Sequence, residues 1–383
     1  MLTREWPPDV YGGAGVHVTN LVSALHRQPG LAVDVHCFGA QRADAMAHPL
    51  PEALSELDPA SQALAVDLSM AQALDQVDVI HSHTWYTNMA GHWGAALHHR
   101  PHVITAHSLE PLRPWKREQL GGGYRISCWA EKTAYLEADA IISVSDGMRQ
   151  DILATYPELN PRRVITIRNG VDTTTFSSRP DERVLKQHQI TSPYAIFVGR
   201  ITRQKGLAHL LRAWRQVPEE VGLVLAASHP DEPGIGAEVA SLIAELQHER
   251  GNIVWIQEML GREELVALLS SARVALVPSV YEPLGIVNLE AMACGTAVIA
   301  SDVGGIPEVV AHGITGELVR HDTDDSQFEA ALAATITRVA TDQPLCDRYG
   351  SAGRRRAVEE FSWDSVAAAT LEVYRRVSAR PRT

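Results

Sequence analysis

The chain has 383 residues, of which 45% are hydrophobic, and its formal net charge is −12 at pH 7. This length predicts two domains, because one hydrophobic core rarely serves so long a chain. The acidic balance argues against nucleic acid and anionic membranes as main partners, since both repel negative charge.

The sequence also limits where the protein works and what it binds. No apolar run is long enough to cross a bilayer, and the first residues are too polar for a secretion signal, so we expect a cytoplasmic protein without a membrane span. The four cysteines are too scattered for a disulfide framework or a zinc site. We expect no cofactor and no metal. The sequence does not decide whether the protein forms a homo-oligomer.

The N-terminal segment predicts a very short strand, a glycine-rich loop and a helix. Gly12 and Gly13 precede an apolar stripe of helical spacing that runs from Val16 to Leu25. Glycines before a helix let the backbone approach a phosphate that the helix N-terminus attracts. A tight strand-to-helix turn has the same appearance, so this loop alone leaves both readings open.

Strands and helices then alternate through the first half. Helices are expected at 60–74, from about Asn88, and from Gly122. This alternation predicts a parallel sheet whose ligands gather beyond the carboxyl ends of its strands. The expected strands are 33–38, 78–83, 103–107, 140–145 and 163–167.

Three histidines, His81, His83 and His107, stand at such strand ends. His81 and His83 share one strand face, so a metal pair is conceivable. No third ligand follows at the expected spacing, which favours substrate or polar contacts instead.

The loop from Ser108 to Tyr124 carries the basic residues Arg113, Lys116 and Arg117 in an otherwise acidic protein. A solvated charged loop is the alternative reading, as for most charge runs. Because arginine suits phosphate oxygens, the loop is a candidate site for an anionic acceptor.

The second half begins after a polar segment, Thr173 to Pro193, that we interpret as a hinge. A strand at 194–200 brings Arg200 and then Lys205 into one loop before a helix, which favours a diphosphate site. Further strands are expected at 223–227 and 252–256, and the residues after the latter, 257–261, are the expected place of a nucleobase.

The segment Tyr281–Glu290 follows a buried strand at 274–278 and leads into a helix. The amides of Leu284, Gly285 and Ile286 are placed to hold an anion at the helix start. Glu282 and Glu290 bracket that place, and carboxylates there would bind hydroxyls of a sugar and a ribose. A capped helix with a solvated glutamate is the alternative.

The C-terminal third predicts a strand at 297–302, a glycine turn at 303–308 and then helices. The last helix, 363–377, has an apolar stripe that suits packing on either half.

Glu282 and Glu290 with the intervening Pro-Leu-Gly resemble the paired-glutamate signature of retaining nucleotide-sugar glycosyltransferases of family four. The segments 2–13, 108–124 and 169–172 are similar to the glycogen-synthase-like branch of that family. The resemblance implies an α/β fold of two Rossmann-like, doubly wound domains facing a cleft. It places an acceptor-side domain at 1–175, a nucleotide-sugar domain at 193–361, and a C-terminal helix at 362–383 that returns to the first domain.

The resemblance also implies roles for individual residues. Members of this branch transfer glucose from ADP-glucose to glucose 1-phosphate without a metal, and the nearest rival activity extends an α-glucan. The donor base, ADP or UDP, is not fixed by the residues. The implied catalytic residues are Arg200, Lys205, Glu282 and His107; the donor-binding residues are Gly12, Gly13, Leu284, Gly285, Ile286 and Glu290; the acceptor-binding residues are Arg113, Lys116 and Arg117.

The sequence disfavours two other classes of protein. A dinucleotide oxidoreductase is disfavoured because the Gly12–Gly15 loop lacks the G-x-G-x-x-G spacing and no acidic residue ends the next strand. A silent sugar-nucleotide-binding protein is disfavoured because both cations and both glutamates are present.

Overall fold

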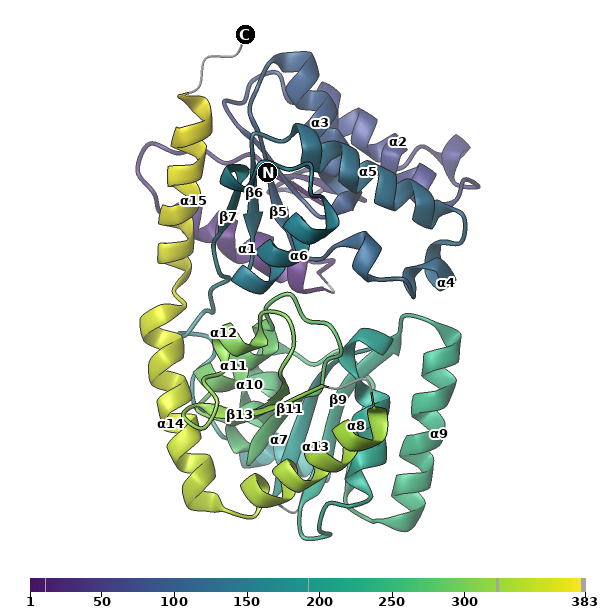
Figure 1. Cartoon of the computed structure of the whole chain (residues 1–383), viewed down its shortest axis with the longest axis vertical. Coiled ribbons are helices and arrows are strands. Elements are labelled where there is room, and N and C mark those ends of the chain that lie inside the picture. The colour runs from purple at the N-terminus through teal and green to yellow at the C-terminus, as the bar shows by residue number, and fades with distance from the viewer. Residues whose placement is uncertain (11, 192, 322–323, 380–383) are drawn as a thin grey trace. The chain divides into compact units, whose positions relative to one another are not determined.

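The computed structural model describes residues 1–10, 12–191, 193–321 and 324–379. The chain divides into two compact units (Figure 1). The first contains residues 1–170 and the segment from Trp363 onward, and the second contains residues 171–362. Residues 380–383 of the expected C-terminal segment lie outside the described part.

The first unit is built on a seven-stranded sheet whose neighbouring strands are all parallel. Strand β1 has β2 on one side and β4 on the other, so the direction of winding switches beside β1. The strand order is β3 (Met46–His48), β2 (His36–Phe38), β1 (Leu2–Thr3), β4 (Ile80–His83), β5 (His102–Ala106), β6 (Ala140–Ser143) and β7 (Val164–Thr166).

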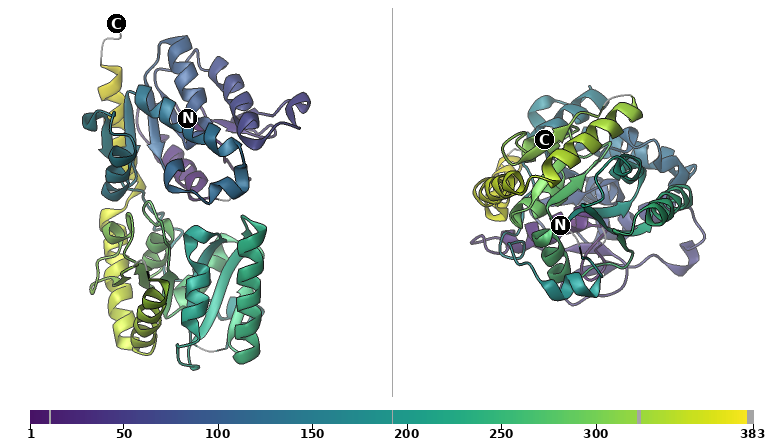
Figure 2. Two further views of the ribbon diagram at one scale, coloured as in Figure 1. Left: turned by 45° about the vertical axis from the view of Figure 1, so that its right-hand side comes forward. Right: turned by 90° about the horizontal axis from the view of Figure 1, so that it is seen from below.

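Residues next to one another in a strand point to opposite sides of the sheet, and both sides of this sheet carry buried apolar residues. Helices therefore cover both faces. Helix α1 (Gly13–Leu25) contacts α15 (Trp363–Ser378) (Figure 1; Figure 2). Apolar side chains of the two helices share a core with Val103 of β5. Ile80 of β4 belongs to a second core with α2 (Pro59–Gln72) and α3 (Trp85–His98). Helix α5 (Gly123–Glu137) packs beside α2 and α3.

The second unit is built on a six-stranded parallel sheet. Its winding switches between β8 and β11, and in such sheets ligands bind outside the strand ends at the switch point. The order is β10 (Ile253–Ile256), β9 (Gly222–Pro230), β8 (Tyr194–Ile201), β11 (Val274–Val277), β12 (Ala297–Ser301) and β13 (Gly316–Val319).

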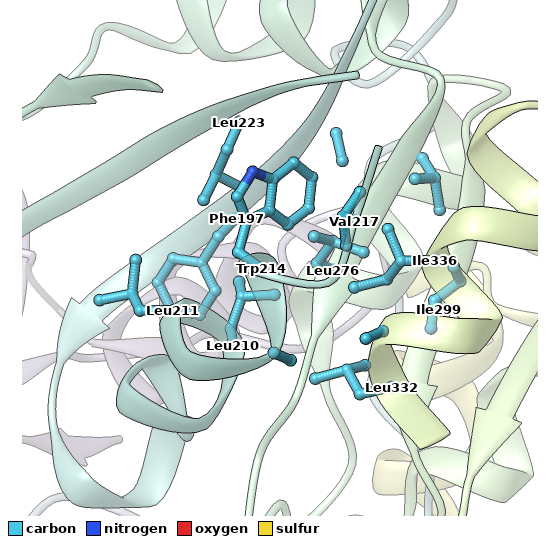
Figure 3. Close-up of a cluster of buried hydrophobic side chains, with 14 of the residues drawn as sticks. Phe197, Leu210, Leu211, Trp214, Val217, Leu223, Leu276, Ile299, Leu332 and Ile336 are labelled. Atoms are coloured by element: carbon cyan, nitrogen blue, oxygen red, sulfur yellow. The ribbon is translucent and has the colours of Figure 1, made fainter. Parts of the chain in front are cut away.

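The core of the second unit lies between this sheet and helices α8 (Leu207–Trp214) and α13 (Asp325–Ala340). Trp214 and Phe197 are among its largest fully buried side chains (Figure 3). Because an aromatic side chain buries 150–250 Å², two of them side by side hold α8 firmly on the sheet. This core supports the end of β8, where Arg200 stands.

The segment after Gly170 is tied to the second unit by one arginine. Arg354 of α14 (Gln343–Glu360) donates hydrogen bonds to the carbonyls of Thr173, Phe176 and Ala293, at 3.1, 2.7 and 2.8 Å. The first part of the expected hinge therefore packs as part of the second unit.

The α/β prediction with two parallel, doubly wound sheets is confirmed. The sequence analysis did not predict two of the strands, β3 and β13. β3 has only three residues and an exposed Met46, and β13 begins at Gly316. Helix α3 begins at Trp85, before the expected Asn88. No helix in the described ranges is both long and apolar enough to span a bilayer.

Candidate functional site

Arg200, Lys205 and Glu282, which the sequence predicts to be site residues, lie together at the switch point of the second unit. Arg200 is near the end of β8, and Lys205 ends the short turn η4 (Arg203–Lys205) that follows. Glu282 follows β11, the neighbour of β8. The Lys205 Nζ donates to Glu282 Oε2 at 2.6 Å, so residues far apart in the sequence form one charged pair.

A glycine makes this close approach feasible. Gly206 has a φ of +65°, and a Cβ placed on it would lie 1.9 Å from the carbonyl oxygen of Pro278. The backbone of the turn also meets the end of β11 directly, since Val280 N–H donates to the Gln204 carbonyl at 2.9 Å. Only glycine lets the Lys205 turn rest on β11 in this way.

Both cations are held by carboxylates in this structure. One guanidinium nitrogen of Arg200 donates to both carboxylate oxygens of Asp231, at 2.8 and 2.9 Å. Glu282 is buried, and it also accepts a hydrogen bond from the Ser279 hydroxyl at 3.3 Å. These partners fix the positions of Arg200 and Lys205 before any ligand arrives.

The loop after Glu282 ends at the N-terminus of α11 (Ile286–Ala293), with Gly285 as its cap at a φ of 96°. Within the described residues, the amides of Leu284 and Gly285 donate no hydrogen bond. The turn at 303–305 packs against the same loop, because Gly305 N–H donates to the Glu282 carbonyl at 3.0 Å. A helix start with open amides is a favourable place for an anion.

Glu290 lies one turn into α11 and is half-buried. Burial raises its pKa to about 7, and the charges of Arg262 and Lys205 partly oppose this rise. Its carboxyl group has no hydrogen bond or ion pair among the described residues. It is therefore open to a ligand that offers hydroxyl groups.

A hollow of about 130 Å³ lies at the carboxyl ends of β8, β9 and β10. One wall is the Trp255 ring, whose Nε1 donates to the Ala227 carbonyl at 3.0 Å. Among the residues expected near a nucleobase, Gln257 lines it. Its other lining residues are Ile201, Ala227, Ser228, Pro230 and Gly236.

In the first unit, the glycine loop before α1 is already occupied by a carboxylate that the sequence reading missed. Gly12 N–H donates to Glu5 Oε2 at 2.7 Å. A Cβ on Gly12 or on Gly15 would lie 2.9 or 2.6 Å from a Glu5 carboxylate oxygen. Of the two expected donor-binding glycines, Gly13 opens the helix, while the Gly12 amide is engaged.

The expected histidines belong to a buried network. His83 and His107 are hydrogen-bonded to one another at 3.0 Å, and His81 bonds to the hydroxyls of Thr105 and Tyr374. Burial, the largest cause, holds the pKa values of all three well below the ordinary histidine value. These imidazoles are therefore neutral hydrogen-bonding groups at neutral pH.

A third histidine, His17 of α1, joins His83 and His107 with ligand atoms within 4.8 Å of one another. No third ligand follows His81 and His83 at a metal-binding spacing in the sequence, and this group omits His81, because the fold brings His17 to His83 and His107 from another element. His17 Nδ1 bonds to Asn169 at 2.7 Å, and burial lowers the His17 pKa to about 4. An ion at this triad would have to replace the hydrogen bond between His83 and His107.

The three basic residues of the 108–124 loop do not form one exposed cluster. Arg113 donates to the Ser108 hydroxyl at 3.2 Å and pairs with Glu110 at 3.5 Å. Lys116 is buried, at 8% exposure. Arg117 is exposed, with its guanidinium carbon 5.5 Å from the centre of the Tyr124 ring. Of the three, Arg113 has the environment of an oriented ligand-binding group.

Comparison with known proteins adds to this geometry. Glycosyltransferase Family 4 matches residues 11–175, and Glycosyl transferases group 1 matches residues 178–356. The alpha-maltose-1-phosphate synthase of Mycolicibacterium smegmatis is 54% identical over 386 residues, covering 99% of each chain. The glycogen synthase of Mycobacterium tuberculosis is 29% identical over 417 residues, covering 98% of this chain and 93% of that relative.

Among solved structures, sucrose-phosphate synthase from Thermosynechococcus elongatus superposes with a TM-score of 0.80 at 24% identity, over 99% of this chain and 98% of that one. This likeness confirms the expected B-type glycosyltransferase fold. The chain is therefore a glycosyltransferase, and it belongs to family 4 and to the group 1 glycosyl transferases.

Proposed function

We propose that this protein transfers glucose from ADP-glucose to glucose 1-phosphate, with retention of configuration, and so makes α-maltose 1-phosphate. The observation that carries the proposal is the 54% identity to an alpha-maltose-1-phosphate synthase over 99% of both chains. The charged groups at the switch point of the second unit support it, since they suit a nucleoside diphosphate leaving group.

The leaving group defines the electrostatic task. As the bond from the anomeric carbon to phosphate breaks, negative charge grows on the diphosphate while the sugar ring becomes oxocarbenium-like. Arg200, Lys205 and the open amides at Leu284 and Gly285 would receive that charge. Because Asp231 and Glu282 already orient the two cations, little reorganisation is needed when the charge develops.

The glutamates would hold the rest of the donor. Glu282, bonded to Lys205, is placed to accept hydrogen bonds from hydroxyls of the transferred sugar. Glu290, whose carboxyl group is unpaired, would bind the ribose. The hollow beside Trp255 and Gln257 would take the base.

The first unit would provide the acceptor side. His107 is half-buried and neutral, so it can exchange hydrogen bonds with a sugar hydroxyl without bringing a charge. Arg113 would bind the phosphate of glucose 1-phosphate. The acceptor 4-hydroxyl would attack the anomeric carbon and pass its proton to the departing phosphate oxygen, so we assign no protein group as covalent nucleophile.

The nearest alternative is extension of a neutral α-glucan from the same donor, which the 29% identity to a glycogen synthase keeps in view. Purified protein incubated with ADP-glucose or UDP-glucose, and with glucose 1-phosphate or glycogen, decides between them by the mass of the product. We expect a maltose phosphate from ADP-glucose and glucose 1-phosphate. Labelled glycogen without maltose phosphate would overturn the proposal.

We also propose that the reaction takes place in the cytoplasm. Cys37, Cys128, Cys294 and Cys346 are all free thiols, and thiols stay reduced in that compartment.

A further inference from the structure

Three neighbouring strands of the first unit deliver chemically related residues to one edge of the sheet. Arg4 directly follows β1, Tyr86 is the second residue of α3 after β4, and Arg113 lies in the loop after β5. The strands β1, β4 and β5 are adjacent and parallel. Since the carboxyl ends of parallel strands share one edge, the three residues belong to the same ligand-binding edge.

Arg4 is stacked on Tyr86. Its guanidinium carbon lies 4.0 Å from the centre of the Tyr86 ring. Arg4 is exposed and Tyr86 is half-buried, so the ring forms a platform beneath the exposed guanidinium group. Stacking holds the guanidinium plane over the ring, and a guanidinium group can bind two phosphate oxygens at once.

Arg113 is held by a chain of buried groups. Its side chain is 13% exposed, and its Nε has no hydrogen-bond partner among the described residues. Glu110, its partner at 3.5 Å, is fully buried and accepts a hydrogen bond from the Ser127 hydroxyl at 2.9 Å. The Glu110 N–H in turn donates to both carboxylate oxygens of Glu131, each at 3.1 Å.

Electrostatics links the two arginines at Tyr86. Burial raises the pKa of the Tyr86 phenol; the Arg4 charge opposes the rise, the Glu110 charge adds to it, and the Arg113 charge opposes it. Both guanidinium groups are therefore within electrostatic range of the same hydroxyl. Burial and the neighbouring Glu110 raise the pKa of Glu131 to about 8, so at neutral pH this second carboxyl adds little negative charge beside Arg113, whose partner is Glu110.

We propose that Arg4, Tyr86 and Arg113 together form a phosphomonoester site, and that Arg4 selects glucose 1-phosphate over neutral acceptors. This inference rests on the proposed function, because it names the group that recognises the acceptor of that reaction. Arg4 and Arg113 bind the phosphate oxygens from the strand ends on either side of β4, and the Tyr86 hydroxyl donates a further hydrogen bond.

The test compares Arg4→Gln, Arg4→Lys and Tyr86→Phe with wild type in initial-rate assays with ADP-glucose. Arg4→Gln is expected to raise KM for glucose 1-phosphate about 10- to 100-fold, because a charge-assisted bidentate contact is lost. KM for ADP-glucose is expected to stay within about twofold, since the proposal assigns Arg4 to the acceptor phosphate. Arg4→Lys is expected to restore only part of the loss. Tyr86→Phe keeps the platform and is expected to cost about tenfold or less.

Arg162→Gln is the matched control. Arg162 is an exposed arginine of the same unit, in the turn η3 (Pro161–Arg163) that precedes β7 and so lies at the opposite edge of the sheet. It should leave both KM values unchanged. Thermal midpoints of all variants, measured beside the kinetics, separate a lost contact from a lost fold.

The outcomes distinguish this inference from the function on which it rests. If wild type makes no maltose phosphate, the proposed function fails. If wild type makes it and Arg4→Gln keeps its KM for glucose 1-phosphate, the function stands and Arg4 is not the selecting residue. Equal rises in both KM values would also overturn the inference, because they would indicate general damage.

Discussion

The polar groups at the ends of β8 and β11 in the second unit differ in charge from the histidines at the ends of β4 and β5 in the first unit. The second unit keeps charged groups in pairs at its switch point, with Lys205 on Glu282 and Arg200 on Asp231. The first unit instead buries neutral imidazoles that bond to one another and to hydroxyls. Charges held ready suit a leaving group that becomes more negative, whereas uncharged donors and acceptors suit a sugar whose charge does not change.

The sharpest way to break this comparison is to remove one of the paired cations. Lys205→Ala is expected to lower kcat about a hundredfold or more, because it removes a preorganised donor to the departing diphosphate. The measurement is turnover of ADP-glucose with glucose 1-phosphate, with circular dichroism to confirm the fold. Lys186→Ala is the control, since Lys186 is an exposed lysine of the same unit. Near-normal turnover in Lys205→Ala would remove the leaving-group role.

A second variant tests whether backbone geometry positions that cation. Gly206→Ala would force a Cβ to within 1.9 Å of the Pro278 carbonyl oxygen at a φ of +65°. It is expected to cost about 2 kcal/mol of unfolding free energy or more, and to lower kcat as the Lys205 turn moves off β11. Urea denaturation and turnover are the measurements. Gly251→Ala, where nothing lies within 4 Å, is the control; equal effects in both would contradict the role of Gly206.

Glu290 provides a pH-dependent test of donor binding by the second unit. Because its pKa is raised to about 7, the free protein carries the proton below that pH, and ribose hydroxyls would bind the ionised form. KM for ADP-glucose should therefore fall as pH rises through about 7 in wild type. Glu290→Gln should raise that KM about tenfold at pH 8 and remove the pH dependence, because a charge-assisted contact is lost.

Stability provides an independent check on the same residue. A carboxyl whose folded pKa is raised above its unfolded value of 4.5 lowers stability as pH rises from about 4.5 through 7. Glu290→Gln should thus melt at a higher temperature than wild type at pH 8, with a smaller difference at pH 5. A variant that lost stability and kept its donor KM would show Glu290 to be structural.

The smallest expected effect separates the arginines of the basic loop. Arg113→Gln should raise KM for glucose 1-phosphate about tenfold, because its oriented guanidinium is removed. Arg117→Gln should change it less than about twofold, since exposed charges contribute little. Initial rates with glucose 1-phosphate measure both. Equal losses would restore the original expectation of one continuous cluster.

The sequence predicted those features whose residues lie close together in the chain. Glu282 and Glu290 lie in one short stretch, and Arg200 and Lys205 in another, so their residue types and spacing could be recognised. Their pairing across β8 and β11 followed only from the sheet order, which no local pattern contains. Amphipathic helices and buried strands could be predicted because burial on one or both faces requires apolar residues at regular spacing or in a continuous run.

The features that were missed are those that several segments build together. Glu5 reaches the Gly12 amide across a loop, and His17 joins His83 and His107 from a helix far away in the sequence. The sequence singled out no role for Arg4, because the Tyr86 ring on which it stacks comes from a distant segment. Lys116 was grouped with its basic neighbours, although the fold buries it. None of these contacts leaves a spacing that a single sequence can reveal.

The place of α15 has a consequence for how the chain is made. Trp363, Val366 and Tyr374 complete a core with Leu21 and Val103, and the Tyr374 hydroxyl bonds to His81 at 2.6 Å. During translation the ribosome delivers every residue of the second unit before this helix. Until then, the apolar residues of the first unit that α15 covers stay exposed in the nascent chain. We therefore expect the N-terminal half to need chaperones until synthesis reaches Tyr374.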